Sequence, residues 1–230
     1  MMSEILLSRR NLDFLLYEVL KVEDLSRFER HQGQDRATYE AILDLYEKLA
    51  TDYFLPHAAE ADAKEPSFDG ETVTVHPAAA PALQALAESG LLAATQSEQD
   101  GGFAVPHAIE RAGIAYLTAA NPGTAGYAFL TIANMNLLRV HASDDQVRRY
   151  VSPMLEGRFF GTMCLSEPQA GSSLADIRTR AIRQSDGRYR LFGNKMWISG
   201  GDHSISENII HAVLAKIPDE TGAIPAGTRG

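Results

Sequence analysis

The sequence predicts a chain of α and β structure in more than one domain, with a helical N-terminal part followed by a β part. Two observations support this fold class. Apolar residues recur at helical spacing as far as Arg158, and short apolar runs typical of strands come after it. We therefore expect an N-terminal α-helical domain over residues 1–157, in which 1–35 is an extension, and a partial β domain over 158–230.

The helical prediction rests on three segments in which four apolar residues share one helical face. The sets are Leu12, Leu15, Leu16 and Val19; Ile42, Leu45, Tyr46 and Leu49; and Val147, Tyr150, Val151 and Met154. Ser143 and Gln146 have the spacing of a capping box at the start of the third helix. We interpret these faces as hydrophobic core and not as cofactor-binding surfaces. Residues 62–77 and 97–106 are rich in turn formers and are expected to be irregular.

Four strands are expected after Arg158, at residues 159–165, 179–184, 189–199 and 208–217. Asp186-Gly187 lies between the second and third strands and predicts a hairpin there. A sheet of only these strands would leave an unpaired edge, which folded proteins normally cover or close. We therefore expect the sequence to be a truncated piece of a longer protein.

Composition excludes several classes of protein. The 230 residues carry a formal net charge of −9, which argues against a nucleic-acid partner. No window contains the roughly 18 consecutive apolar residues of a transmembrane helix, and the N-terminus lacks the apolar stretch of a signal peptide. Cys164 is the only cysteine, so a disulfide framework is impossible and a cytoplasmic location is expected. Within an apolar run, Cys164 should be buried and unreactive.

The common catalytic signatures are missing. The sequence contains no G-x-G-x-x-G after a strand, no P-loop, no H-E-x-x-H and no G-x-S-x-G. The histidines are scattered, and only His203 and His211 lie close together, without an evident third metal ligand. We interpret them as structural or solvated, and we expect no metal site.

The first stretch that suggests a ligand site is "CLSEPQAGSS", Cys164 to Ser173. A strand ends there, and its backbone groups and the Ser166 hydroxyl could face a planar heteroaromatic edge. Ser173 and Asp176 have the spacing of a helix cap, and the free N–H groups of a helical turn suit a phosphate. The alternative is a strand–turn–helix joint with ordinary caps.

The second stretch is "GNKMWISGGDH", Gly193 to His203. On a strand, Trp197 and Ser199 would share a face, so that an indole and a hydroxyl could meet a flavin edge. The alternative is a core aromatic residue. Nearby basic residues could steer an anionic substrate or form a solvated face of the sheet. They are Arg178, Arg180, Arg183, Arg188, Arg190 and Lys195.

Taken together and in this order, the motifs resemble the acyl-CoA dehydrogenase family. Its pattern C-[LV]-[ST]-E-P-x-A-G-S-D is similar to "CLSEPQAGSS", and N-G-x-K-x-W-I-[ST]-x-G is similar to "FGNKMWISGG". "SEQDGG" and "SDDQVRRYVSPMLEG" also resemble family segments, so the likeness extends from about Tyr39 onward. "GGDHSISENIIHAVLA" resembles most the branch of longer enzymes that includes 3-methylmercaptopropionyl-CoA dehydrogenase.

The resemblance implies a helical domain, a β-barrel-like middle domain of which this chain holds the start, and a C-terminal helical bundle that is absent. It implies FAD as cofactor, with cofactor-binding roles for Met163, Leu165, Ser166, Trp197 and Ser199. Ser172 would contact the acyl-CoA substrate, at its phosphate-bearing part. Electron-transfer flavoprotein would be the electron acceptor, and the complete protein would be a homo-oligomer without a membrane span. Two departures from the pattern are Ser173, where Asp is usual, and Phe192-Gly193, where Asn-Gly is usual.

The function implied is FAD-dependent α,β-dehydrogenation of an acyl-CoA thioester. The family's catalytic base is a glutamate of the C-terminal domain, and no position of this chain matches it, so no catalytic residue is assigned. Glu167 belongs to the matched motif and is not the base. We therefore expect this chain alone to be inactive. The alternative is a non-catalytic flavin- or CoA-binding fragment or partner subunit, whereas a relative that acts on alkylated DNA is disfavoured because no basic nucleic-acid face is predicted.

Overall fold

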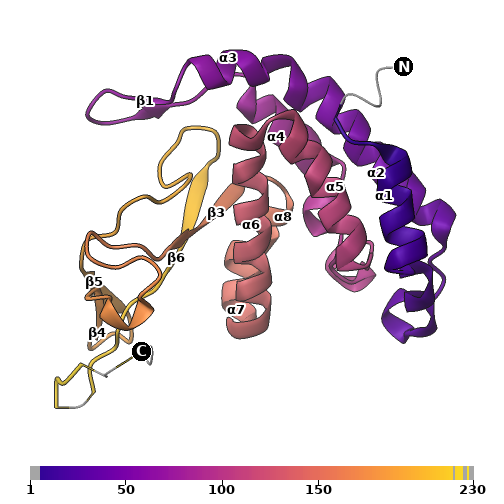
Figure 1. Ribbon diagram of the computed structural model, residues 1–230. Coiled ribbons are helices and arrows are strands. Elements are labelled where there is room, and N and C mark those ends of the chain that lie inside the picture. Colours follow the sequence, from indigo (N-terminus) through magenta and orange to yellow (C-terminus); the bar gives the residue numbers. More distant parts are fainter. Residues whose placement is uncertain (1–5, 220, 225–226, 228–230) are drawn as a thin grey trace.

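The structure is a computed structural model that describes residues 6–219, 221–224 and 227. Figure 1 shows a layer of helices with the strands grouped on one side of it. The helices, π-helical segments included, are α1 (Arg9–Asp13), η2 (Phe14–Val19), α2 (Arg36–Leu49), η5 (Ala50–Phe54), α3 (Ala58–Ala63), α4 (Ala79–Glu88), α5 (His107–Ala120), α6 (Pro122–His141), α7 (Asp144–Gln146), η9 (Val147–Val151) and α8 (Ser152–Leu155).

The core lies among α2, α4, α5 and α6, and most of the predicted helical faces point into it. Tyr46 and Leu49 are buried, as are Val151 and Met154. Helices α2 and α5 come together at Gly113, where an added Cβ would lie 2.1 Å from the Tyr46 ring. The predicted capping box of Ser143 is confirmed, because both of its hydrogen bonds are formed.

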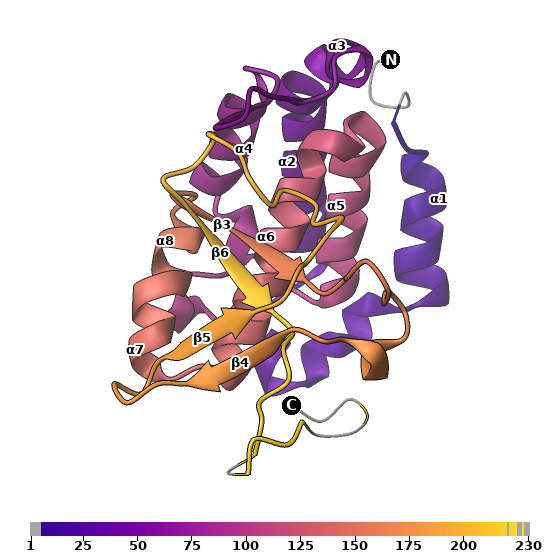
Figure 2. The ribbon, with the colours of Figure 1, turned by 90° about the vertical axis from the view of Figure 1, so that its left-hand side faces the viewer.

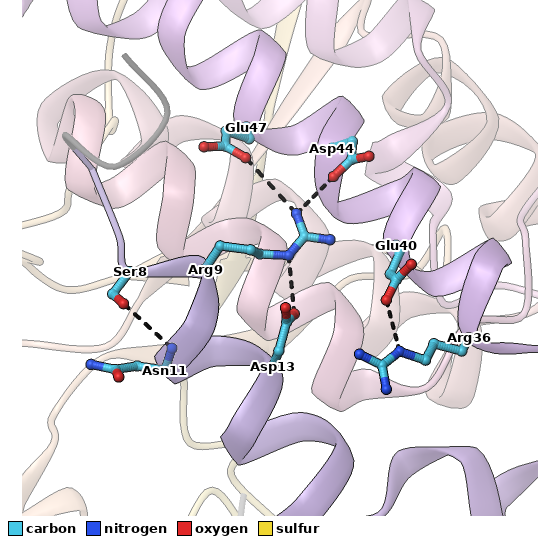
Figure 3. Close-up of polar contacts among 8 residues, drawn as sticks. All are labelled: Ser8, Arg9, Asn11, Asp13, Arg36, Glu40, Asp44 and Glu47. Atoms are coloured by element: carbon cyan, nitrogen blue, oxygen red, sulfur yellow. Dashed lines mark hydrogen bonds and ion pairs between the residues drawn. The ribbon is translucent and has the colours of Figure 1, made fainter. Parts of the chain in front are cut away.

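The shared apolar face predicted for Leu12, Leu15, Leu16 and Val19 is only partly confirmed. Leu16 is buried, but Leu15 and Val19 are 50% and 55% exposed. The reason is that η2 is π-helical, and its wider turn takes residues spaced by three and four off a common face. Helix α1, which precedes η2, is held to α2 by a contact between Arg9 and Asp44. Figure 3 shows the Arg9 guanidinium between Asp13 and Asp44, at 3.1 and 2.7 Å.

The strands form three separate pairs. They are β1 (Ser67–Phe68), β2 (Val73–Thr74), β3 (Phe159–Cys164), β4 (Arg180–Arg183), β5 (Tyr189–Phe192) and β6 (Asn208–Val213). Strands β3 and β6 pair in parallel, whereas β4 pairs antiparallel with β5 and β1 antiparallel with β2. Figure 2 shows β3 and β6 side by side, with the β4–β5 hairpin below them.

Three expectations about strands need correction, and one of them is that the strand expected at 208–217 ends at Val213. The segment expected to be irregular, 62–77, contains the small β1–β2 hairpin, which projects from the helical layer in Figure 1. The strand expected at 189–199 ends at Phe192. The backbone leaves the ladder at Gly193, whose Cβ, if added, would lie 2.7 Å from the Cα of Thr179. The predicted hairpin around Asp186-Gly187 is confirmed, with Arg183 opposite Tyr189.

Helix α6 fixes the β3–β6 sheet in place. The Asn134 side-chain amide donates hydrogen bonds to the carbonyl oxygens of Thr162 and Ile210, both at 2.9 Å, and thereby bridges the two strands. The backbone N–H of Gly161 donates to the Thr131 hydroxyl at 3.0 Å. A Cβ at Gly161 would lie 2.6 Å from the Cβ of Asn134, so only glycine allows this close approach of helix and strand.

The structure therefore confirms a mixed α and β fold with helices first and most strands later. Within the described residues, the strands make three two-stranded sheets and no closed barrel. In the same part of the chain, no helix combines the length and apolar character needed to cross a bilayer.

Candidate functional site

The two motifs lie side by side, although about thirty residues separate them in sequence. The backbone N–H of Met196 donates to the carbonyl oxygen of Ser166 at 3.0 Å. The Lys195 ammonium donates to the carbonyl oxygen of Leu165 at 2.9 Å. The end of β3 and the segment that carries Trp197 are thus joined by hydrogen bonds into one surface.

Glu167 fastens the turn that follows β3. Its buried carboxylate accepts hydrogen bonds from the backbone N–H groups of Arg178 and Thr179, at 2.7 and 3.0 Å. Lys195 donates to the same carboxylate at 2.9 Å and forms an ion pair with it. Burial by itself would raise the pKa of Glu167, but these hydrogen bonds outweigh burial and hold that pKa well below its usual value. Glu167 is therefore a structural anion and not a free base.

Trp197 is 84% exposed, the most exposed large apolar side chain among the described residues. Its φ of 60° lies in the left-handed region, which is strained for a bulky residue. Such strain persists only where the surrounding contacts enforce it, and it concentrates at ligand sites. An exposed indole held in this way indicates a surface that a planar ligand can cover.

Three polar groups of the two motifs have no hydrogen-bond partner in the part of the chain that the structure describes. Within the described residues, no hydrogen bond is made by the N–H of Leu165 or by the hydroxyls of Ser166 and Ser199. Met163 is 45% exposed on β3 next to them. These groups supply N–H and O–H donors beside apolar surface, which is the combination that the edge and face of a flavin require.

The predicted phosphate-binding helical turn is present but is not capped as expected. Leu174–Asp176 forms a single 3-10 turn, and the Ser173 side chain makes no capping hydrogen bond. Instead the Ser172 carbonyl oxygen accepts from the N–H of Leu174 at 3.1 Å, so local backbone pairing replaces the side-chain cap. Ser172 is exposed beside this turn.

The prediction that Trp197 and Ser199 share one face of a strand is also wrong, because neither residue lies on a strand. Lys195 was grouped with the solvated basic residues, but its side chain is only 12% exposed and faces Glu167. A lysine directly before the apolar run "MWI" was the available signal. A sequence cannot say which carboxylate such a lysine meets.

His203 was interpreted as structural, and it packs close to the site. The buried ring meets the Tyr127 and Phe160 rings edge-on, with centroids 5.2 and 5.9 Å away. Burial lowers its pKa, so the ring is neutral near pH 7. His211 donates to or accepts from the Thr162 hydroxyl at 2.7 Å. Cys164 is buried, as expected.

One cavity flanks the joined motifs, and a second cavity lies apart from them. One of about 290 Å³ lies between the β3–β6 and β4–β5 sheets, and Cys164, Lys195 and Ile198 are among its lining residues. Another, of about 500 Å³, lies between α3 and the start of α6 and is lined by none of the predicted site residues. The candidate site is therefore the joined surface of the two motifs and not the larger cavity.

Comparisons with known proteins agree with the motifs. The family model for the acyl-CoA dehydrogenase N-terminal domain matches residues 36–158. The 3-methylmercaptopropionyl-CoA dehydrogenase of Ruegeria pomeroyi is 30% identical over 190 residues, which cover 83% of this chain and 32% of that protein. The chain spans about a third of the length of the curated relatives it matches.

Solved structures show the same fold. Butyryl-CoA dehydrogenase from Megasphaera elsdenii aligns with a TM-score of 0.65 at 22% identity, over 80% of this chain and 45% of that one. Acyl-CoA dehydrogenase from Bacillus anthracis, complexed with FAD, aligns with a TM-score of 0.65 at 21% identity, over 85% and 32%.

Proposed function

The chain belongs to the acyl-CoA dehydrogenase family, and on this premise we propose that it forms the flavin-side part of an FAD-dependent acyl-CoA dehydrogenase. The observation that supports this most strongly is the joint between the two motifs, Met196 N–H to Ser166 carbonyl at 3.0 Å. It brings together residues that the family resemblance assigns to the cofactor.

Each proposed role corresponds to a group that is available in the structure. The Leu165 N–H and the Ser166 hydroxyl would bind the polar edge of the flavin ring, with the backbone of Met163 beside them. Trp197 would pack against the ring, and Ser199 would donate near its reactive nitrogen. Lys195 and Glu167 would not touch the cofactor. They would hold both segments in register through their buried ion pair.

When bound, FAD would supply an acceptor for the β-hydrogen of the thioester as a hydride, and a carboxylate base would be needed to remove the α-proton. Glu167 is not that base, since Lys195 and two backbone N–H groups bind its carboxylate. We therefore propose that the base comes from outside these 230 residues and that this chain alone does not turn over acyl-CoA. Ser172 would contact the substrate, and an electron-transfer flavoprotein would reoxidise the complete, oligomeric enzyme.

Flavin retention tests the proposal. The purified chain is mixed with FAD and passed through gel filtration, and the bound flavin is measured by its visible absorption and by bleaching with dithionite. Ser166→Ala and Trp197→Ala should each lower the retained flavin. Ser185→Ala, an exposed serine of the β4–β5 turn, is the matched control and should retain as much as the parent chain. Equal retention in all variants would refute the assigned roles.

A further inference from the structure

One side of η2 exposes apolar side chains, although the other side is buried. Leu16 and Tyr17 lie in a buried cluster with Leu43 of α2. The exposed residues are Phe14 (52%), Leu15 (50%), Val19 (55%) and Leu20 (60%), which directly follows the helix. These four residues are called here the η2 face. Exposed apolar residues that gather on one short segment in this way mark a protein–protein interaction site.

Charged residues lie at both ends of a groove beside the η2 face. The groove has a volume of about 740 Å³, and Arg10, Phe14 and Glu18 are among its lining residues. Arg10 and Glu18 are exposed, and neither forms an ion pair with another residue among 6–219, 221–224 and 227. The other charged groups of the groove, Asp13 and Arg36, are already paired within the chain (Figure 3). The groove therefore presents a cation, an aromatic ring and an anion in that order.

This order of groups makes the surface complementary to itself. If a two-fold axis passes close to Phe14, the η2 helices of two copies run antiparallel, and Arg10 of each copy faces Glu18 of the other. Two opposite-charge pairs then flank a centre formed by the apolar residues of both copies, which is the usual arrangement of an apolar core and a polar rim. A parallel arrangement would instead bring like charges together, which is destabilising.

The position of η2 leaves this surface accessible. Figure 1 shows α1 at the outer edge of the helical layer, on the side opposite the strands, and Figure 2 again shows it at the edge. Helix η2 continues directly from α1. Association through the η2 face would therefore leave the joined motifs uncovered.

We propose that the η2 face joins two copies of this chain, with antiparallel η2 helices and an ion pair between Arg10 and Glu18 at each end. The occupant is a second copy because the chain itself supplies both halves of the complementary charge pattern. The proposal goes beyond the proposed function and does not depend on it. Since few side chains contribute, the interface is small for a specific complex, and we expect a dissociation constant on the order of 10–100 µM.

Sedimentation velocity of the 230-residue chain, over about 5 to 500 µM, tests the proposal. Replacing Leu15 and Val19 together by glutamate should weaken dimerisation by at least about tenfold, because charged side chains would be buried at its centre. Val140→Glu is the matched control and should dimerise like the parent, since Val140 is 73% exposed near the end of α6. Circular dichroism checks that each variant folds.

Charge reversal tests the antiparallel arrangement. Arg10→Glu and Glu18→Arg should each weaken dimerisation by about tenfold, because both end contacts become repulsive. An equimolar mixture of these two variants should dimerise like the parent, because every end contact then joins opposite charges again.

Four results would overturn the proposal. A chain that stays monomeric at the highest concentration would leave the η2 face to a different partner. Dimerisation that survives the glutamate substitutions at Leu15 and Val19 would run through another surface. Dimerisation that Val140→Glu also abolishes would be unspecific apolar association. A mixture of the two charge-reversed variants that stays monomeric would exclude the antiparallel contact.

Discussion

The ion pair between Lys195 and Glu167 is the contact on which the joined motifs depend, and Lys195→Met removes it. The two side chains are only 12% and 3% exposed. Removing one partner of a buried pair leaves an uncompensated charge and costs about 3–5 kcal/mol. Glu167 would keep its hydrogen bonds from the N–H groups of Arg178 and Thr179, so we expect the lower end, about 3 kcal/mol.

Urea unfolding followed by circular dichroism measures this loss. Lys48→Met is the matched control, because Lys48 and Asp52 form an exposed pair with 71% and 44% of their side chains accessible. Removing that pair should cost only about 0.3–0.5 kcal/mol. The reasoning is refuted if Lys195→Met loses no more stability than Lys48→Met does. The variant should also retain less FAD, because the Lys195 hydrogen bond to Leu165 is lost.

Three further predictions concern single positions. Gly161→Ala should cost about 1–3 kcal/mol in urea unfolding, because the new Cβ would meet Asn134 at 2.6 Å. Trp197→Gly should change the unfolding free energy by less than about 1 kcal/mol. Glycine relieves the strain of the left-handed backbone, which stabilises the folded chain, but it also raises the conformational entropy of the unfolded chain, which offsets that gain. Burial lowers the pKa of His203, so the unfolded chain binds a proton that the folded chain does not. Stability should therefore fall as the pH drops below about 6.5, and His203→Leu should flatten that dependence.

Local patterns in the sequence were enough for part of the fold. Ser143 and Gln146 predicted their capping box, and Asp186-Gly187 predicted the β4–β5 hairpin, because each signal lies within a few residues. The first strand, 159–165, was predicted almost to its end. The exposed Leu15 was missed because a π-helical turn leaves no mark in hydrophobic spacing.

The rest of the site depends on contacts between distant residues. Trp197 was expected on the strand predicted at 189–199, but Lys195 and Met196 are bound to the turn after β3, and the chain leaves the sheet. The pairing of Lys195 with Glu167, like the burial of Lys216, follows from tertiary structure. The domain division at residue 157 and the roles of Met163, Ser166 and Ser172 remain predictions.

The central claim, that the joined motifs form a flavin-binding surface, is tested most directly by the emission of Trp197. It is the only tryptophan of the chain and is 84% exposed, so its fluorescence reports on this surface alone. Titration with FAD should quench the emission in a saturable way and shift it toward the blue, and Ser166→Ala should require more FAD. The claim would be contradicted if the emission maximum of Trp197 stays at the wavelength of an indole in water and FAD quenches the emission only by diffusional collision, without saturation.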